Sequence, residues 1–366
     1  MTGIFSYSSF QSQTDGFSSL NDSSGVVFQF NYTRAYEHIR NQLDFGDRIP
    51  DTAASNFTKN YIISEMYPIA SILQHEYTIH DVPCTNIIAK VNEGKGPILV
   101  FAAHFDSRAI AEKDPSPTYR TLPTPGANDG AGSVAVLIEL MKVIANNASQ
   151  WNNEVWAVFF DAEDQGSGGL PNWEYIEGSN KMVQDMKEDP EFFFGNGSGK
   201  SLKDISRFIL LDMVCGKNLK MIYEGYSNRV LLQSIFDTAE RLGYSDIIPS
   251  DTKSYSITDD HKPFAENGIT TANLIIKFWD TSAGWPYHHT RQDTLDNIDV
   301  ESIKSIGHTL ESWIRDYFIT NRYSLPETSN PSATIDGFDH FTLISLVFLF
   351  SLIVIIHKNR KEKCGN

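Results

Sequence analysis

The sequence predicts an α/β protein in which a mostly parallel, twisted mixed sheet is covered by helices on both faces, giving three layers. The continuous apolar run 97–103 (PILVFAA) is typical of a strand buried on both faces, and 154–160 (EVWAVFF) is predicted to be the next buried strand. These runs alternate with segments of helical periodicity, which favours parallel strands joined by crossover helices. A hydrophobic fraction of 41% with 12% aromatic residues is sufficient for a sizeable core.

One domain, residues 26–325, accounts for the predicted elements in order. The expected helices span 33–45, 57–72, 133–144, 230–242 and 300–319. The expected strands are a hairpin near 77–79 and 86–91, then 97–103, 154–160, 207–211, 219–223 and 271–276.

The two ends of the chain differ from this domain. Residues 1–25, rich in Ser, Gly, Asp and Gln, are expected to form a flexible lead, and the polar stretch 326–340 a linker. Residues 341–357 contain sixteen consecutive uncharged residues (FTLISLVFLFSLIVII), near the lower length limit for a transmembrane helix. A basic tail, 358–366, follows this segment. We therefore expect a single-pass membrane protein with a C-terminal anchor.

Two features favour an extracellular domain. Basic residues next to a membrane span favour the cytoplasmic side for the tail. Five Asn-x-Ser/Thr acceptors are compatible with an exterior location: Asn21, Asn31, Asn56, Asn147 and Asn196. The alternative is a tail-anchored protein with a cytoplasmic domain, because the first 25 residues show neither the basic region nor the apolar run of a signal peptide.

Charge and cysteine content exclude some classes of protein. With 30 Lys and Arg against 46 Asp and Glu, the formal net charge is -16, which argues against a nucleic-acid partner. The three cysteines show neither CxxC spacing nor the density of a disulfide scaffold.

Carboxylates and imidazoles follow the apolar strands, at the edge where ligands of open α/β sheets bind. The segments concerned are 104–107 (HFDS), 126–130 (GANDG), 161–164 (DAED), Asp212 and 287–290 (YHHT). Each has an ordinary explanation alone, such as a core histidine, a helix N-cap or a solvated acid. Together, these acids would repel one another unless a divalent cation bound them, and mixed nitrogen and oxygen ligands suit zinc. Two cations sharing one carboxylate would suit so many anionic groups.

The ordered motifs HFDS, GANDGAGS, FFDAED, LLDM and YHHTRQDT resemble the co-catalytic zinc exopeptidases, a clan of bacterial leucyl aminopeptidases, glutamate carboxypeptidases and glutaminyl cyclases. The resemblance covers roughly 85–320 and implies their fold and one or two zinc ions. It implies Glu163 as the general base and Asp106 as the residue that orients His104. The zinc ligands that it implies are His104, Asp129 as the bridge, Asp164, Asp212 and His289, with His288 as the rival of His289. The family usually has Glu-Glu where this chain has Glu163-Asp164.

The resemblance implies a metallo-aminopeptidase that hydrolyses the N-terminal bond of peptides with a free amino terminus through a metal-activated water. GANDGAGS and Asp293-Thr294 favour this activity. A glutaminyl-peptide cyclotransferase is the alternative, because 173–179 (WEYIEGS) and 259–264 (DDHKPF) resemble that branch. Asp260 and Trp285 are the candidate substrate-binding residues, although Asp260 has a helix-capping alternative and Trp285 a packing one. An inactive receptor-like scaffold is disfavoured, since every ligand and Glu163 are retained.

Overall fold

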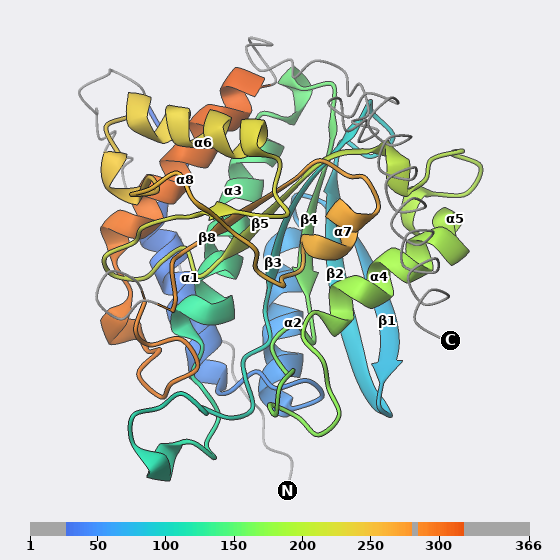
Figure 1. The fold of residues 1–366 in the computed structure, drawn as a ribbon. Coiled ribbons are helices and arrows are strands. Elements are labelled where there is room, and N and C mark those ends of the chain that lie inside the picture. The colour runs from blue at the N-terminus through green and yellow to red at the C-terminus, as the bar shows by residue number, and fades with distance from the viewer. Residues whose placement is uncertain (1–26, 280–284, 318–366) are drawn as a thin grey trace, which may run out of the picture. The chain divides into compact units, whose positions relative to one another are not determined.

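The computed structural model of the chain describes residues 27–279 and 285–317 (Figure 1). The predicted lead, 1–25, the linker, 326–340, the membrane span, 341–357, and the basic tail, 358–366, lie outside the described residues. Within the described part, none of the helices combines the length and the apolar character needed to cross a membrane. The membrane anchor stays a prediction.

A six-stranded mixed sheet forms the centre of the domain, with strand order β1-β2-β4-β3-β5-β8. Its strands are β1 (Ser71–Ile79), β2 (Val82–Val91), β3 (Ile98–His104), β4 (Glu154–Phe160), β5 (Ile205–Asp212) and β8 (Thr271–Ile275). The strands β4, β3, β5 and β8 run parallel, whereas β1 and β2 form an antiparallel hairpin whose β2 pairs antiparallel with β4. The parallel half therefore carries four strand ends to one edge.

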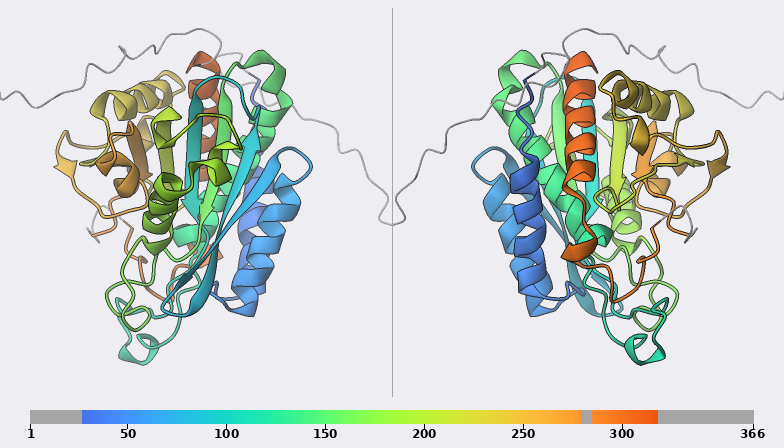
Figure 2. Two further views of the ribbon diagram at one scale, coloured as in Figure 1. Left: turned by 90° about the vertical axis from the view of Figure 1, so that its right-hand side faces the viewer. Right: turned by 90° about the vertical axis from the view of Figure 1, so that its left-hand side faces the viewer.

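Helices cover both faces of the sheet (Figure 2). The larger core includes buried residues from α1 (Tyr32–Phe45), α2 (Ala53–Met66), α3 (Ser133–Asn146), α6 (Arg229–Arg241) and α8 (Val300–Arg315). The smaller core packs α4 (Glu177–Glu188), α5 (Pro190–Phe194) and α7 (Lys262–Glu266) against side chains of β2, β3, β4 and β5. Polar caps fix several helix starts: Asn31, Thr52, Asn228 and Asp299 each accept a backbone N–H at the beginning of α1, α2, α6 and α8.

Short elements complete the described chain. Single turns of 3₁₀-helix span Pro117–Tyr119, Ala148–Gln150, Leu202–Asp204, Ser245–Ile247 and Leu295–Asn297, and a π-type turn spans Ala127–Gly132. The strands β6 (Tyr223–Glu224) and β7 (Ser254–Tyr255) pair in a separate two-stranded sheet.

The three-layer architecture is confirmed, with one element of the main sheet wrongly predicted. The apolar run 219–223 is not a strand of that sheet. Met221 makes a single bridge to Ile276, and the chain then enters β6. Leu219, Met221 and Tyr223 are nevertheless buried, because this segment packs into the larger core. Its apolar pattern therefore reports burial without the strand pairing that we inferred from it.

Candidate metal centre

The first cluster of candidate metal ligands joins three distant segments. His104 ends β3, Asp212 ends β5, and Asp129 lies in the turn before α3. Nε2 of His104 is 3.2 Å from Oδ1 of Asp129 and 3.4 Å from Oδ1 of Asp212. One candidate ligand atom from each residue lies within 4.8 Å of the other two. The parallel strand ends thus bring these predicted ligands together.

The polar atoms of this cluster fit a zinc ion. Both ring nitrogens of His104 and Oδ1 of Asp212 are buried without a hydrogen bond of good geometry among the described residues. Buried polar atoms are seldom left unsatisfied in folded proteins. One imidazole and two carboxylates match the donors of a catalytic zinc site, which keeps a further position for water or substrate.

A second cluster shares Asp129 with the first. Asp129, His288 and His289 each present a ligand atom within 4.8 Å of the others. Nε2 of His289 also lies 3.0 Å from Oδ1 of Asp164. The structure therefore brings Asp164, His289 and the shared Asp129 to one place, and it places His288 beside them.

Hydrogen bonds distinguish the two adjacent histidines. Nδ1 of His289 lies 2.7 Å from Oε1 of Glu112, and a carboxylate only accepts, so His289 donates from Nδ1, and the neutral ring keeps its lone pair on Nε2. Nδ1 of His288 lies 2.7 Å from Nζ of Lys113, and an ammonium only donates, so His288 accepts at Nδ1 and carries its proton on Nε2. The tautomers therefore favour His289 as a ligand through Nε2.

Asp106 connects the ends of β3 and β4. Its carboxylate accepts hydrogen bonds from the backbone N–H of Glu163 at 3.1 Å and of Asp164 at 3.1 Å, and from the Gln165 amide at 2.9 Å. Oδ1 of Asp106 also lies 3.4 Å from Nδ1 of His104. One fully buried side chain thus positions the candidate base as well as a candidate ligand. The sequence analysis predicted only that Asp106 orients His104, and the contacts with the backbone of Glu163 and Asp164 are additional.

A buried carboxylate and a buried guanidinium hold the loop that carries Asp129. Asp293 accepts from the backbone N–H of Asn128 at 2.8 Å and of Asp129 at 3.0 Å. Arg48 donates to the carbonyls of Phe105, Pro125 and Gly126. The sequence drew attention to Asp293 only as part of a motif, and no local signal marked Arg48, Glu112 or Gln165.

Strained backbone conformations lie beside the candidate ligands. Ala162, Met213 and His289 have φ angles of 61°, 51° and 56°, a region that residues with side chains seldom adopt. Such strain persists only where surrounding contacts enforce it, and it concentrates at functional sites. Gly130, with φ 99°, allows a close approach here, because an added Cβ would lie 2.7 Å from the Asp106 carbonyl oxygen.

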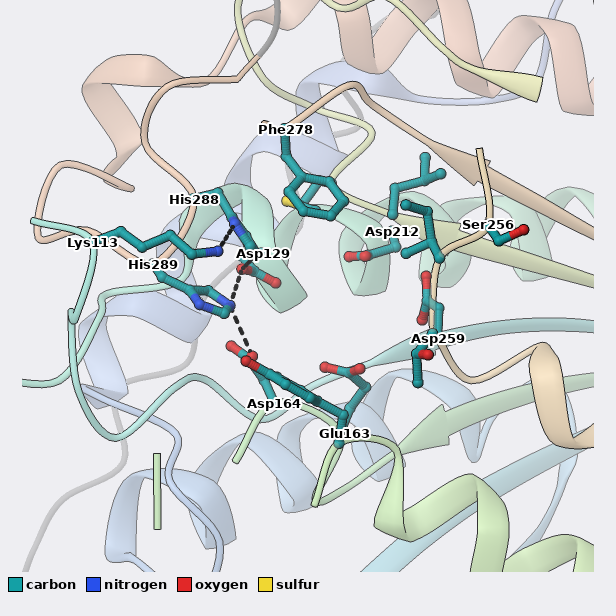
Figure 3. Close-up of a pocket in the computed structure, with 15 residues that line it drawn as sticks. Lys113, Asp129, Glu163, Asp164, Asp212, Ser256, Asp259, Phe278, His288 and His289 are labelled. Carbon is teal, nitrogen blue, oxygen red and sulfur yellow. Dashed lines mark hydrogen bonds and ion pairs between the residues drawn. The ribbon is translucent and has the colours of Figure 1, made fainter. Parts of the chain in front are cut away.

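A cavity of about 370 Å³ opens over both clusters (Figure 3). Its lining includes five carboxylates and two imidazoles: Asp129, Glu163, Asp164, Asp212, Asp259, His288 and His289. Neither predicted substrate-binding residue is part of the lining. Trp285 is fully buried in the larger core against Tyr287, which supports its packing alternative. Asp260 is also fully buried, and its neighbour Asp259 faces the cavity instead.

The protonation of the acids reflects their crowding. Burial raises the pKa of Glu163 well above its ordinary value, and the charges of Asp164 and Asp260 raise it further against the attraction of His104. Burial likewise raises the pKa of Asp212 to about 6, although His104 opposes the rise. A divalent cation would reverse this balance, because it favours the charged form of every acid around it.

Comparison with known proteins identifies the family. The model of peptidase family M28 matches residues 86–314, well over half of the chain. The chain belongs to peptidase family M28. This confirms the predicted resemblance. The proteins similar to this chain include both aminopeptidases and glutaminyl cyclases.

Three similar proteins illustrate the range within M28. Aminopeptidase YwaD of Bacillus subtilis (strain 168) is 28% identical over 227 residues, which are 60% of this chain and 41% of that protein. A Zn-dependent exopeptidase from Parabacteroides distasonis has 30% identity and a TM-score of 0.67, with 79% of this chain and 99% of that one covered. The Porphyromonas gingivalis glutaminyl cyclase has 26% identity and a TM-score of 0.70, over 79% and 99% of the two chains. The M28 chain therefore spans less than half of the Bacillus aminopeptidase and nearly all of both solved structures.

Proposed function

We propose that this M28 protein is a zinc-dependent metallo-aminopeptidase that hydrolyses the N-terminal bond of peptides. The observation that carries the proposal is the pair of ligand clusters that share Asp129. His104 and Asp212 would complete one metal position, and Asp164 and His289 the other. A shared carboxylate between two metal positions suits activation of a water for attack on an amide.

Zinc bound at these positions would lower the pKa of a bound water and polarise the substrate carbonyl. Glu163, which lines the cavity, would take the proton of the attacking water and return it to the leaving amine. Its position suits this work, because its carboxyl group shares the cavity lining with Asp129, Asp164 and Asp212. Asp106 would keep Glu163 in place through its backbone hydrogen bond. Asp259, on the cavity wall, is the acid that we propose for the substrate's α-ammonium group.

A glutaminyl-peptide cyclotransferase is the second candidate. Several similar solved structures are glutaminyl cyclases, and the protein with the TM-score of 0.70 is one of them. The acids of the site also suit a reaction in which the substrate's own amine attacks. Burial raises the pKa of Asp259 to about 7, and the charge of Asp212 raises it further. The ionised form of this carboxyl group lines the cavity, where it can accept a proton from a bound α-ammonium group.

Metal content and parallel assays test both activities. Full-length protein should bind two zinc ions per chain and hydrolyse leucyl-p-nitroanilide, and a chelator should abolish the turnover. Cyclisation of Gln-peptides without anilide hydrolysis would refute the peptidase proposal and establish the cyclase. Turnover of neither substrate by the zinc-loaded protein would favour the inactive scaffold.

We also propose that the C-terminal segment anchors the protein in a membrane with the M28 domain outside the cell. The support is the uncharged segment 341–357 followed by a basic tail. Protease added to intact cells should remove the domain. Protection of the domain from protease, together with membrane association, would show the tail-anchored arrangement.

A further inference from the structure

Lys113 is the one lysine or arginine among the described residues that line the cavity, where it faces a set of acids. Its ammonium makes no ion pair with a carboxylate within the described parts of the chain, although five carboxylates share the lining. Its hydrogen-bond partner is Nδ1 of His288, at 2.7 Å. An ammonium group has three donors, so this bond leaves two for a ligand.

Several contacts fix the position of Lys113 at the cavity. Its backbone N–H donates to the carbonyl of His289 at 3.2 Å. The preceding residue, Glu112, accepts from Nδ1 of His289 and pairs with Arg108. The ammonium group lies 5.8 Å from the centre of the Phe278 ring, which also lines the cavity. The lysine therefore belongs to the wall of the site, although its side chain remains open to solvent.

Lys113 and Asp259 lie on opposite sides of the cavity (Figure 3). Lys113 lies beside His288 and His289, whereas Asp259 and Ser256 lie across the cavity, with Glu163 between these sides (Figure 3). A substrate α-ammonium group bound by Asp259, as proposed above, would lie on the side of the cavity away from Lys113. The part of the substrate beyond the scissile bond would then extend toward Lys113. One imidazole ring, that of His288, separates Lys113 from Asp129, the carboxylate common to both clusters.

We propose that Lys113 binds a substrate carboxylate, and that the preferred substrates are dipeptides whose C-terminal carboxylate lies one residue beyond the scissile bond. The proposal rests on the proposed action at peptide amino termini and names the substrate class. Only the His288 ring separates Lys113 from Asp129 of the metal clusters. Each further residue of an extended peptide adds about 3.5 Å, so the C-terminal carboxylate of a longer peptide would lie past the lysine. Lys113 is thus a specificity-determining residue rather than a proton carrier.

Matched substrates measure this preference. Leu-Gly and Leu-Gly-amide differ only in the C-terminal charge, and Leu-Asp-amide places a carboxylate in a side chain instead. The full-length protein should have a kcat/KM about three- to tenfold higher for Leu-Gly than for its amide, the range of a partly exposed charged contact. Lys113→Gln should remove the difference through KM, and Lys113→Arg should retain it. Lys253→Gln removes the same charge from an exposed residue outside the cavity lining and serves as the control.

The outcomes separate this proposal from the proposed function. Equal kcat/KM values for acid and amide, or a preference that survives in Lys113→Gln, would overturn it while peptidase activity stands. A Lys113-dependent preference for Leu-Asp-amide over Leu-Gly would support the carboxylate site and refute the dipeptide preference. If Gln-peptides are cyclised instead, Gln-Gly and its amide make the same comparison. Calorimetric binding of Leu-Gly and its amide to the zinc-loaded Glu163→Gln protein measures the preference even without turnover.

Discussion

Glu112→Gln is expected to weaken one metal position and leave the other intact. The two oxygens of Glu112 serve two donors: Oε1 lies 2.7 Å from Nδ1 of His289, and Oε2 lies 2.6 Å from Nε of Arg108. Burial would raise the pKa of Glu112, but His289 and Arg108 outweigh it and hold this pKa at about 2. The residue is therefore an anion at any pH used for assays. Glutamine has an NH2 group in place of one of these two oxygens, so one of the two donors would face another donor.

The size of the effect follows from these contacts. A carboxylate behind a ligating histidine fixes the ring and increases its basicity, and loss of such a partner typically weakens metal binding by about 10- to 100-fold. This corresponds to about 1.4–2.8 kcal/mol. The freed Arg108 adds to the loss, because its Nη1 already lies 3.5 Å from Oδ1 of Asp164 and would compete with the metal for that carboxylate. His104 and Asp212 have no contact with Glu112 among those that the structure shows, so the other position should keep its affinity.

Titration of the zinc-free protein with zinc, in competition with a chromophoric chelator, resolves the two affinities. The wild-type protein should show two tight sites, and Glu112→Gln one tight site and one that is weaker by the factor above. Glu301→Gln is the matched control, since Glu301 is exposed and its carboxylate pairs, among the described residues, only with Lys304 of the same helix α8. Two unchanged affinities in Glu112→Gln would refute the inference that Glu112 positions His289. Loss of both sites would show that the substitution disturbs the whole loop.

Three further predictions concern the base, the metal-bearing loop and pH. Glu163→Gln should retain zinc and lose about 10²- to 10⁴-fold in kcat, the usual contribution of a general base; near-normal turnover with full zinc content would exclude that role. Asp293→Ala leaves the buried N–H groups of Asn128 and Asp129 without their acceptor, so the free energy of unfolding, measured with denaturant, should fall by about 2–4 kcal/mol. A change below about 0.5 kcal/mol would contradict the positioning role. In the zinc-free protein, burial alone would lower the pKa of His289. Asp164 and Glu112 outweigh the effect of burial, and the pKa rises from 6.5 to about 9. The imidazolium therefore stabilises the zinc-free fold fully below pH 6.5, and this contribution disappears as pH rises through 9, so Tm should fall across that window in chelator-treated protein; a flat or rising Tm would refute the assignment.

The parallel half of the sheet was the most predictable part of the fold. Strand 154–160 is apolar after Glu154 because helices cover both faces of the sheet, and β4 has these same bounds. The antiparallel hairpin is confirmed, but the predicted first strand, 77–79, is too short. The strand β1 begins at Ser71, and its first residues are partly exposed, so their sequence lacks the apolar pattern of a buried strand. The helix α4 was missed because its buried face is narrow and most of its residues are polar or charged. The segment 219–223 was wrongly predicted to be a strand of the main sheet, because a buried loop segment has the same apolar composition as a buried strand.

The candidate ligands could be predicted because they directly follow strands or form recognisable motifs. Asp129, Asp164 and His289 are placed by chain segments that the sequence does mark. Their supporting residues could not be predicted in the same way. Arg48 and Glu112 lie in loops, and the contacts that Arg48 makes with Phe105 and Glu112 with His289 join residues far apart in the sequence. Whether an Arg or a Glu in a loop is a solvated charge or a buried support depends on tertiary packing, which no local pattern reports.

The carboxylate of Asp106 has a consequence for how the protein loses activity on heating. Because it contacts His104, the last residue of β3, and the backbone of Glu163, three residues after β4, the spacing between His104 and Glu163 is tied to the ends of two central strands. Such core elements open only with the whole domain, whereas loops and termini open locally at low cost. Thermal inactivation and global unfolding of the zinc-loaded protein should therefore coincide in one transition. Below that transition the spacing between His104 and Glu163 should stay unchanged.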